Sequence, residues 1–406
     1  MRFDQLNQDE QALAQACLAA EQDIITLRRE LHAHPELSFQ EFETTKKLAK
    51  LLQDLGLEVC LYEPTGLSAD LCGTAEGAED GACILLRADM DALEVCEATG
   101  LEYSSKHEGL MHACGHDTHV AMLYGAIKAL VEHKDKLKGR VRFVFQPAEE
   151  IARGALKLIE QGVMEGVDAC YGSHIFASQK KGSFDVKAGP RYAAADYCDI
   201  YFTGFASHGA QPHLGIDCAV MLAHFVSNIQ AVVSRRIDPQ HPAVLTVGKM
   251  LSGTRFNIVP GSAECSLTVR SFYPEDRELI KSSIEDYAQH IAAMEGGTAR
   301  IDYTYGTQIV KNHEDMTAGV QRLIAKLAGK EALLDLDATL GGEDFGAYSD
   351  MVPGCFVNLG GGFEDSSLNY PNHNEKFTID ESSLVGGSIL YSLVAYEYLS
   401  GMLMRD

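Results

Sequence analysis

Three apolar runs in the first half of the chain end in residues that can bind a metal ion or move a proton. Asp89 follows the first run, Glu149 and Glu150 follow the second, and His174 ends the third. Because the carboxyl ends of strands in an open α/β sheet share one edge, these side chains are expected to converge there. Carboxylates and an imidazole at one edge can bind metal or transfer protons.

A Cys and a His two residues apart lie between these runs, in residues 112–117 (HACGHD). A helical pattern starts at Thr118, so Cys114 and His116 are expected at a helix N-terminus, where a thiolate is favoured. A lone buried Cys or His is usually structural, and adjacent glutamates can begin a solvated helix. Thiolate, imidazole and carboxylate groups gathered at strand ends and helix starts instead predict a metal site.

The elements that position these residues alternate between helix and strand. Helical spacing of apolar residues covers 9–33, 41–55, 118–132 and 152–160, and short apolar runs cover 83–86, 141–145 and 167–171. This alternation predicts a mostly parallel sheet covered by helices.

The pattern changes after residue 196. Strand-like runs cover 197–202, 244–247 and 263–272, and helical patterns cover 218–236 and 276–294. This order suits a small α+β unit of ferredoxin-like type. Helix and strand alternate again beyond residue 309. We therefore expect a catalytic domain of residues 1–190 and 306–406, interrupted by an inserted domain of residues 191–305.

The charge of the chain narrows the classes of partner. Its 406 residues contain 34 Lys and Arg against 58 Asp and Glu, a net charge of −24. Such a chain repels phosphate backbones and anionic membranes, so nucleic acid and membrane are not expected partners. The absence of a signal-like N-terminus and the 11 scattered cysteines lead us to expect reduced thiols and a cytoplasmic protein. An anionic substrate would require local cationic groups.

Five motifs resemble those of the bacterial zinc amidohydrolases. They are residues 87–93 (RADMDAL), 111–117 (MHACGHD), 146–150 (QPAEE), 207–213 (SHGAQPH) and 341–345 (GGEDF). That family includes aminoacylases, hippurate hydrolases and indole-acetyl-amino-acid hydrolases, and is related to dimetal carboxypeptidases. The resemblance runs in order from about His32 to the C-terminus. It implies an α/β, dimetal-peptidase-like catalytic domain with a mixed central sheet and an inserted ferredoxin-like lid and dimerisation domain.

The resemblance also implies a ligand set for two divalent metal ions. The implied ligands are Cys114, His116, Glu150, His174 and His373. Zn is the expected metal, with Mn, Co or Ni able to substitute. Cys114 stands where the related carboxypeptidases have a bridging Asp, and Arg87 stands where they have a His ligand, whose role His116 would take. Glu375, in the place of a common Pro, is a departure in the last ligand loop.

By the same resemblance, Glu149 is the general base, which takes a proton from water and passes it to the leaving amine. Spacing alone also allows Glu149 as ligand with Glu150 as base, but the order in the family favours Glu149. Asp89 is assigned to the catalytic group as a carboxylate outside the ligand set. His208 matches a lid His that stabilises the oxyanion, in several relatives from the partner subunit.

Substrate contacts are expected from the inserted domain. Asn257 and Arg270 stand where related enzymes hold the substrate carboxylate, an anion that a fork-shaped guanidinium suits. His208 is also assigned to substrate binding. The same domain is expected to join two chains in a homodimer. His119 and His213 are interpreted as structural.

These predictions favour an amidohydrolase that cleaves N-acyl amino acids or related small amide conjugates. A dipeptidase or carboxypeptidase of the same architecture is the first alternative. The second is a metal-binding protein without catalysis. Structural zinc sites are normally closed sets of four Cys and His ligands, so the Glu149–Glu150 pair and Asp89 argue against it.

Overall fold

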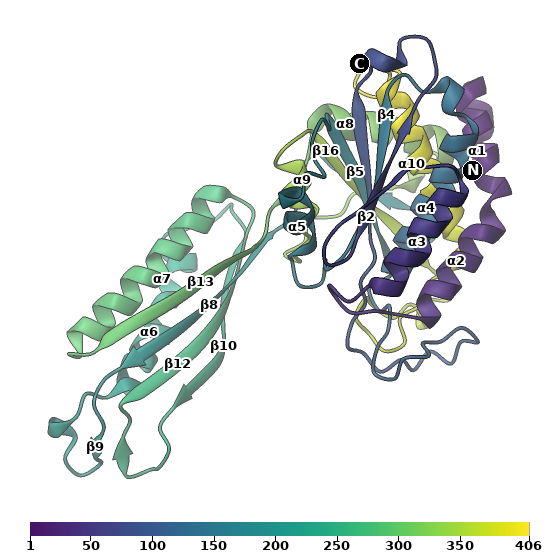
Figure 1. Ribbon diagram of the computed structural model, residues 1–406. Coiled ribbons are helices and arrows are strands. Elements are labelled where there is room, and N and C mark those ends of the chain that lie inside the picture. Colours follow the sequence, from purple (N-terminus) through teal and green to yellow (C-terminus); the bar gives the residue numbers. More distant parts are fainter. Residues whose placement is uncertain (406) are drawn as a thin grey trace. The chain divides into compact units, whose positions relative to one another are not determined.

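The computed structural model describes residues 1–405, and the chain divides into two compact units. The first unit contains Met1–Arg191, Val310–Asp337 and the residues from Asp344 onward, and the second contains Tyr192–Ile309 and Ala338–Glu343. The chain therefore leaves the first unit for one large insertion and again for a short segment (Figure 1). Each unit has its own apolar core.

Eight strands of the described chain form a mixed sheet at the centre of the first unit. Their order is β1 (Val59–Leu61), β2 (Leu67–Cys72), β4 (Arg140–Gln146), β3 (Cys83–Asp89), β5 (Ala169–Lys180), β16 (Gly354–Gly362), β6 (Phe184–Asp185) and β15 (Leu333–Leu334). Strands β4, β3, β5 and β16 run parallel, whereas β1, β2 and β4 pair antiparallel. Every residue of β3 is buried, which explains its uninterrupted apolar start.

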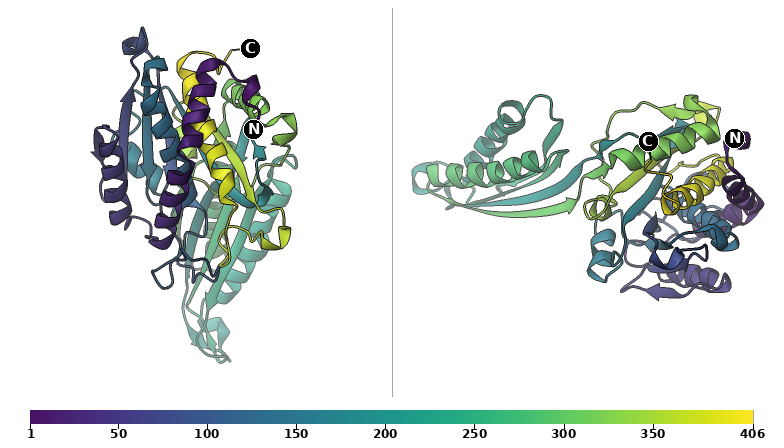
Figure 2. Two further views of the ribbon diagram at one scale, coloured as in Figure 1. Left: turned by 90° about the vertical axis from the view of Figure 1, so that its right-hand side faces the viewer. Right: turned by 90° about the horizontal axis from the view of Figure 1, so that it is seen from above.

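Helices cover this sheet (Figures 1 and 2). They are α1 (Gln8–Ala19), α2 (Glu21–Ala33), α3 (Phe42–Asp54), α4 (His116–Glu132), α5 (Gly154–Glu160), α8 (Glu314–Ala328), α9 (Gly346–Ser349) and α10 (Leu384–Leu399). Helices α4 and α10 contact each other and β3, and both are largely buried, so they are apolar on nearly all sides. Helix α3 buries only one stripe, which includes Leu48 and Leu52.

Two sequence expectations differ from the observed elements. The single helical stretch expected over residues 9–33 is two helices, because the chain turns at Ala20 and both α1 and α2 then pack on α4. The strand expected to end before His174 continues to Lys180. It does so because the apolar residues after His174 pair with β16, with Asn358 opposite His174. His174 is therefore held by strand pairing on both sides of its position.

The second unit is an antiparallel sheet with helices on one face (Figure 2, right). The strand order is β10 (Ala243–Ser252), β12 (Ser262–Ser271), β8 (Ala194–Thr203) and β13 (Thr298–Thr307), and the helices are α6 (Cys218–Arg235) and α7 (Pro274–Met294). Buried and less buried residues alternate along β12, as expected of a strand covered on one face. A small pair, β9 (Ser207–His208) with β11 (Ile258–Val259), lies beside the β10–β12 hairpin.

A further pair, β7 (Gly189–Tyr192) with β14 (Val310–Asn312), forms where the chain enters and leaves the insertion. The predicted fold class, an α/β catalytic domain with a mixed sheet and an inserted α+β domain, is confirmed. Among the described residues, the helices include none whose length and apolar character would let it cross a membrane.

Candidate metal centre

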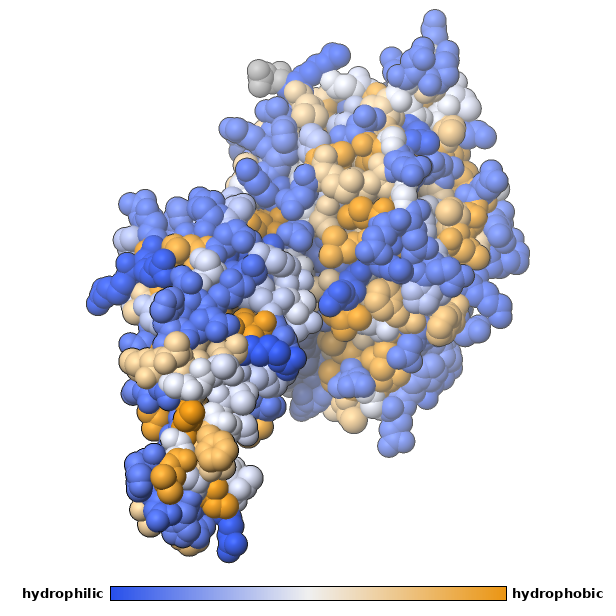
Figure 3. All heavy atoms as spheres, turned by 60° about the vertical axis from the view of Figure 1, so that its left-hand side comes forward, coloured by the Kyte–Doolittle hydropathy of each residue, from blue (hydrophilic) through white to orange (hydrophobic). Residues whose placement is uncertain are grey.

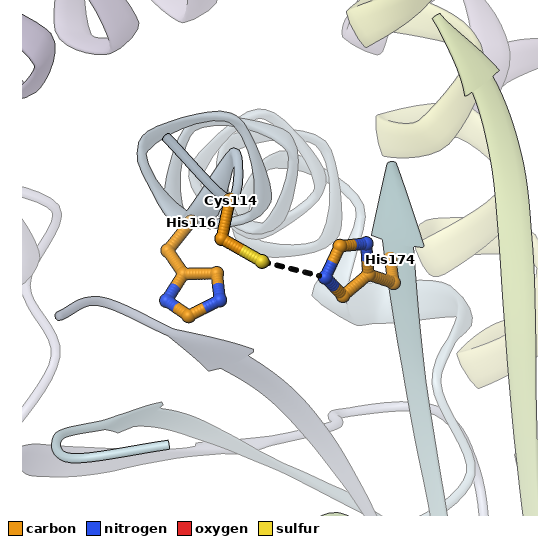
Figure 4. Close-up of side chains that lie close together, drawn as sticks. All are labelled: Cys114, His116 and His174. Carbon is orange, nitrogen blue, oxygen red and sulfur yellow. Dashed lines mark hydrogen bonds between the residues drawn. The ribbon is translucent and has the colours of Figure 1, made fainter. Parts of the chain in front are cut away.

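Cys114, His174 and His373 meet although they come from three distant segments. Cys114 lies just before α4, His174 lies in β5, and His373 lies in the loop after β16. The Cys114 Sγ is 3.3 Å from the His174 Nε2 and 3.3 Å from the His373 Nε2. Figure 4 shows the sulfur of Cys114 between the rings of His116 and His174. One sulfur thus faces imidazoles on two sides.

The five predicted ligands fall into two overlapping sets. Ligand atoms of Cys114, His116 and His174 lie within 4.8 Å of one another, and so do those of Cys114, Glu150 and His373. The His373 Nε2 is 3.6 Å from the Glu150 Oε2, and the His116 Nε2 is 3.8 Å from the Glu150 Oε1. Cys114 belongs to both sets, the position that a bridging ligand would occupy.

The donor atoms fit a pair of divalent metal ions. The His116 Nε2 and the Glu150 Oε1 are buried without a hydrogen-bond partner, which is rare for polar atoms of a folded protein. Burial, together with Glu150, raises the pKa of the Cys114 thiol, and a bound cation would reverse that shift by favouring the thiolate. A mixed thiolate, imidazole and carboxylate set suits Zn and similar divalent ions.

Backbone and carboxylate partners fix the two buried imidazole ligands. The His174 Nδ1 donates to the Ile175 carbonyl oxygen at 2.8 Å. The His116 Nδ1 lies 3.0 Å from the Asp91 carbonyl oxygen and 3.1 Å from the Asp91 Oδ1. Each ring therefore keeps its Nε2 for a metal ion. Asp91 was not among the predicted site residues, although it lies two residues after Asp89 in the same motif.

Asn372 connects the ligand segments through the backbone. Its Nδ2 donates to the Cys114 carbonyl oxygen at 2.8 Å and to the Ile175 carbonyl oxygen at 3.2 Å. The next residue, His373, has a left-handed φ of 69°, a backbone conformation that residues other than glycine rarely adopt. Glu375 is exposed, and its backbone carbonyl oxygen accepts a hydrogen bond from the Ala98 N–H. The departure at Glu375 therefore leaves His373 beside Cys114.

Glu149 and Glu150 follow β4 in a sharp bend. Ala148 has a φ of 55°, and its N–H donates to the Glu41 Oε1 at 2.9 Å. The Glu149 Oε2 is 3.9 Å from the His116 Nε2, and its side chain is 11% exposed. The Glu150 N–H donates to Asp91, so the backbone of Glu150 is fixed beside the ligands. Both carboxylates thus reach the centre, and Glu150 alone belongs to the set with His373.

Asp89 is completely buried and both of its oxygens are engaged. The Oδ2 accepts from the Arg87 Nη1 at 2.6 Å, and the Oδ1 lies 2.5 Å from the His119 Nδ1. Burial opposes ionisation, but Arg87, His116 and His119 hold the pKa of Asp89 well below its ordinary value. Asp89 is therefore an ionised carboxylate in a buried network, a placement that favours support of the ligands over direct proton transfer.

Arg87 joins three of the sequence motifs. Its Nε donates to Gln146 at 2.9 Å, and its Nη2 donates to Asp344 at 2.8 Å. Gln146 and the Ala155 N–H also donate to Asp344. At the position that the resemblance assigns to a metal-ligating His, this chain has a buried cation that pairs with two carboxyl groups, those of Asp89 and Asp344.

His208 and Asn257 lie together in the second unit. Ile258 is paired with His208, and the Gly209 N–H donates to the Asn257 carbonyl oxygen at 2.8 Å. The Ala210 N–H donates to the His208 Nδ1 at 3.0 Å, so the Nε2 carries the proton. Residues of this region line a shallow pocket: Ala206, Ser207, His208, Arg255, Asn257 and Ile258.

Arg270 lies near the end of β12 in the four-stranded sheet, opposite Ala195 and Val244. Asn257 lies beyond Ser262, where β12 begins, so about eight strand residues, roughly 26 Å, separate the two. The expected pair of Arg270 and Asn257 is therefore not formed within one chain. His213 is exposed, whereas His119 is buried and has the partners Asp89 and Ile175.

A dinuclear metallohydrolase is the class of protein that this sheet edge and donor set define. The chain belongs to the peptidase family M20/M25/M40, whose model matches residues 85–396. This family membership confirms the resemblance read from the five motifs.

Relatives within the family carry different activities in their names. Thermostable carboxypeptidase 1 of Saccharolobus solfataricus is 38% identical over 380 residues, covering 92% of this chain and 95% of that protein. N-acetyl-L-cysteine deacetylase of Bacillus subtilis is 38% identical over 368 residues, covering 91% and 86%. The structure of the Bacillus subtilis YXEP protein, a dinuclear metal-binding peptidase of the M20 family, has a TM-score of 0.81 at 34% identity, covering 94% of this chain and 99% of that one.

Proposed function

We propose that this protein hydrolyses the amide bond of N-acyl amino acids, with two divalent metal ions held by Cys114, His116, Glu150, His174 and His373. The observation that carries the proposal is the Glu149 carboxylate, which lies 3.9 Å from the His116 Nε2 at the edge of both ligand sets. A largely buried carboxylate beside a dinuclear centre is placed for general base catalysis.

Glu149 performs the proton transfers of the reaction. It accepts a proton from the attacking water and returns it to the leaving nitrogen, so the C–N bond breaks to give a carboxylic acid and an amino acid. When bound, the metal ions supply Lewis-acid polarisation and acidify water. Glu150 stays with the ligands, because its backbone N–H is held by Asp91 and its side chain faces His373.

The substrate carboxylate needs a cation, because the chain as a whole carries a charge of −24. Arg270 is that cation, and His208 and Asn257 complete the site from a second copy of the chain. Their separation along β12 supports this division of roles, since one chain cannot bring all three to one carboxylate.

A homodimer through the second unit follows from this arrangement. Among the described residues, strand β10 pairs with a neighbour on one side only, and Met250 and Leu251 on it are 47% and 52% exposed. Phe256, in the loop that follows, is 98% exposed. Figure 3 shows apolar atoms at this end of the second unit. An edge strand with exposed apolar residues favours pairing with another copy.

The alternative function is a carboxypeptidase or dipeptidase activity, which the relative named as a carboxypeptidase supports. The test uses substrates that release the same amino acid: N-acetyl-Met, N-benzoyl-Met, Gly-Met and N-acetyl-Gly-Met, with metal-loaded protein. We expect kcat/KM for one of the first two to exceed that for both peptides by about tenfold or more. A preference for either peptide would replace the proposal by this alternative. The Glu149→Gln protein, prepared identically, controls for contaminating hydrolases.

A further inference from the structure

A buried chain of hydrogen bonds runs behind the metal ligands of the first unit. Arg87 donates to Asp89, the His119 Nδ1 lies 2.5 Å from the Asp89 Oδ1, and the Ile175 N–H donates to the His119 Nε2 at 2.9 Å. Arg87, Asp89 and His119 are at most 1% exposed. These hydrogen bonds connect the carboxyl end of β3, the first turn of α4 and the middle of β5.

The hydrogen bonds define which nitrogen of His119 carries the proton. The Nε2 accepts from a backbone N–H, so the proton of a neutral ring must be on the Nδ1, which then donates to Asp89. Both ring nitrogens are therefore engaged: the Nδ1 donates to Asp89, and the Nε2 accepts from Ile175.

The peptide group that His119 binds belongs to a ligand segment. Ile175 directly follows His174, and its carbonyl oxygen accepts from the His174 Nδ1 at 2.8 Å. The ring centroids of His119 and His174 are 4.6 Å apart in an edge-to-face arrangement. The backbone of one residue, Ile175, thus connects the two rings, with its N–H bound to His119 and its carbonyl oxygen bound to His174.

We propose that His119 is a positioning residue for the metal site, which fixes the backbone of Ile175 and thereby aims the His174 Nε2 at the metal. Its own nitrogens are already used, so it is not a ligand. The inference rests on the metal site of the proposed function and is independent of the choice of substrate. The bond that matters is the one from the Ile175 N–H, because Asp89 retains Arg87 as a second donor.

Two substitutions separate the two hydrogen bonds of His119. In His119→Gln, the longer side chain places its oxygen near the former Nε2, so it can still accept from Ile175. In His119→Asn, the amide nitrogen lies near the former Nδ1, so it can donate to Asp89 but not reach Ile175. His133→Asn, just after the end of α4, is the matched control.

Co(II) titration of metal-free protein, followed by its visible absorption, measures both metal affinities. We expect His119→Asn to lower the binding affinity for one of the two metal ions by about 10- to 100-fold, the usual effect of losing a hydrogen-bond partner of a metal-bound His. His119→Gln and His133→Asn should keep both affinities within about threefold of the original protein, a difference small beside that loss. Thermal unfolding of the metal-free proteins checks that all variants fold.

An equal loss of metal affinity in His119→Gln and His119→Asn would contradict the proposal, since a direct ligand would behave in that way. Unchanged affinity in both would contradict it as well. Should His119→Asn not fold, His119→Gln decides alone, because the proposal requires it to retain both metals. Two Co(II) ions bound by the original protein without hydrolysis of N-acyl amino acids would refute the proposed substrate and leave this inference standing.

Discussion

At the scale of residues, the adjacent Glu149 and Glu150 have different surroundings. Glu150 faces His116 and His373, and its backbone is held by Asp91, whereas Glu149 lies beside His116 and Glu150 and is not in the set with His373. Sequence spacing cannot separate two neighbouring carboxylates. The bend at Ala148, which only the folded chain shows, separates them in space.

Glu149→Gln should therefore retain both metals and lose turnover by about 10²- to 10⁴-fold, because the amide occupies the same space but cannot accept a proton. Glu150→Gln and Cys114→Ala should lose metal. Metal content by mass spectrometry and the rate with an N-acyl amino acid are measured on the same preparations. If Glu149→Gln empties the site while Glu150→Gln keeps it, the two glutamates exchange roles.

The proposed ligands could be named from the sequence because their types and order match a family. The residues that orient them were not predicted in that role. Asp91 stands in a quoted motif, and His119 lies three residues after His116, one turn along α4, so periodicity could have indicated both. Asn372 gives no such signal, because its contacts with the Cys114 and Ile175 carbonyls depend on loop geometry.

At the scale of elements, the helix and strand pattern was predicted well where periodicity is strong. The predicted bounds of the strand that starts at Cys83 and of the helix that ends at Glu132 agree with the structure to within a few residues. Sequence order does not show that Arg270 and Asn257 lie toward opposite ends of β12, so the expected pair stays a prediction that requires two chains. The loop between β3 and α4 also gave no pattern, although polar contacts hold it firmly.

Glu97 anchors that loop. It lies 3.3 Å from the His32 Nε2 of α2, and it accepts from the Ser105 N–H at 2.6 Å. Burial opposes ionisation, but hydrogen bonds from His32, Ser105 and Thr99 lower the pKa of Glu97 from 4.5 to about 2. A folded-state pKa below the ordinary value stabilises the fold above pH 4.5, and this stabilisation is lost as the pH falls toward 2.

Glu97→Gln should lower the free energy of unfolding of the metal-free protein by about 1 to 2 kcal/mol at pH 7. The difference from the original protein should shrink as the pH falls below 4.5. Urea unfolding at several pH values measures it, with Glu102→Gln, an exposed position of the same loop, as control. A difference that is the same at every pH would mean that the charge of Glu97 contributes nothing.

At the scale of the whole molecule, the proposed site needs more than one chain. His208 and Asn257 lie together, far along the sheet from Arg270. The strand edge of β10 and the exposed Phe256 offer a surface for a second copy. The dimer and the sharing of residues between chains are therefore a single proposal.

Mixing two inactive proteins tests this sharing. In a mixed dimer of Glu149→Gln and His208→Ala chains, one site has an intact Glu149 together with an intact His208 from the partner. We expect subunit exchange to restore roughly a quarter of the original activity, since about half of the dimers are mixed and each has one complete site. No recovery, despite exchange shown by mass spectrometry, would place His208 in the same chain as its site or outside catalysis.

Dependence of amide hydrolysis on two metal ions is the central claim, and metal removal followed by back-titration tests it most directly. The purified protein is treated with a chelator, and Zn(II) is then added in steps while hydrolysis of an N-acyl amino acid is followed. Activity should disappear with the metal and return as the content approaches two ions per chain, because two ligand sets share Cys114. Full hydrolysis by protein shown to be metal-free would contradict the account.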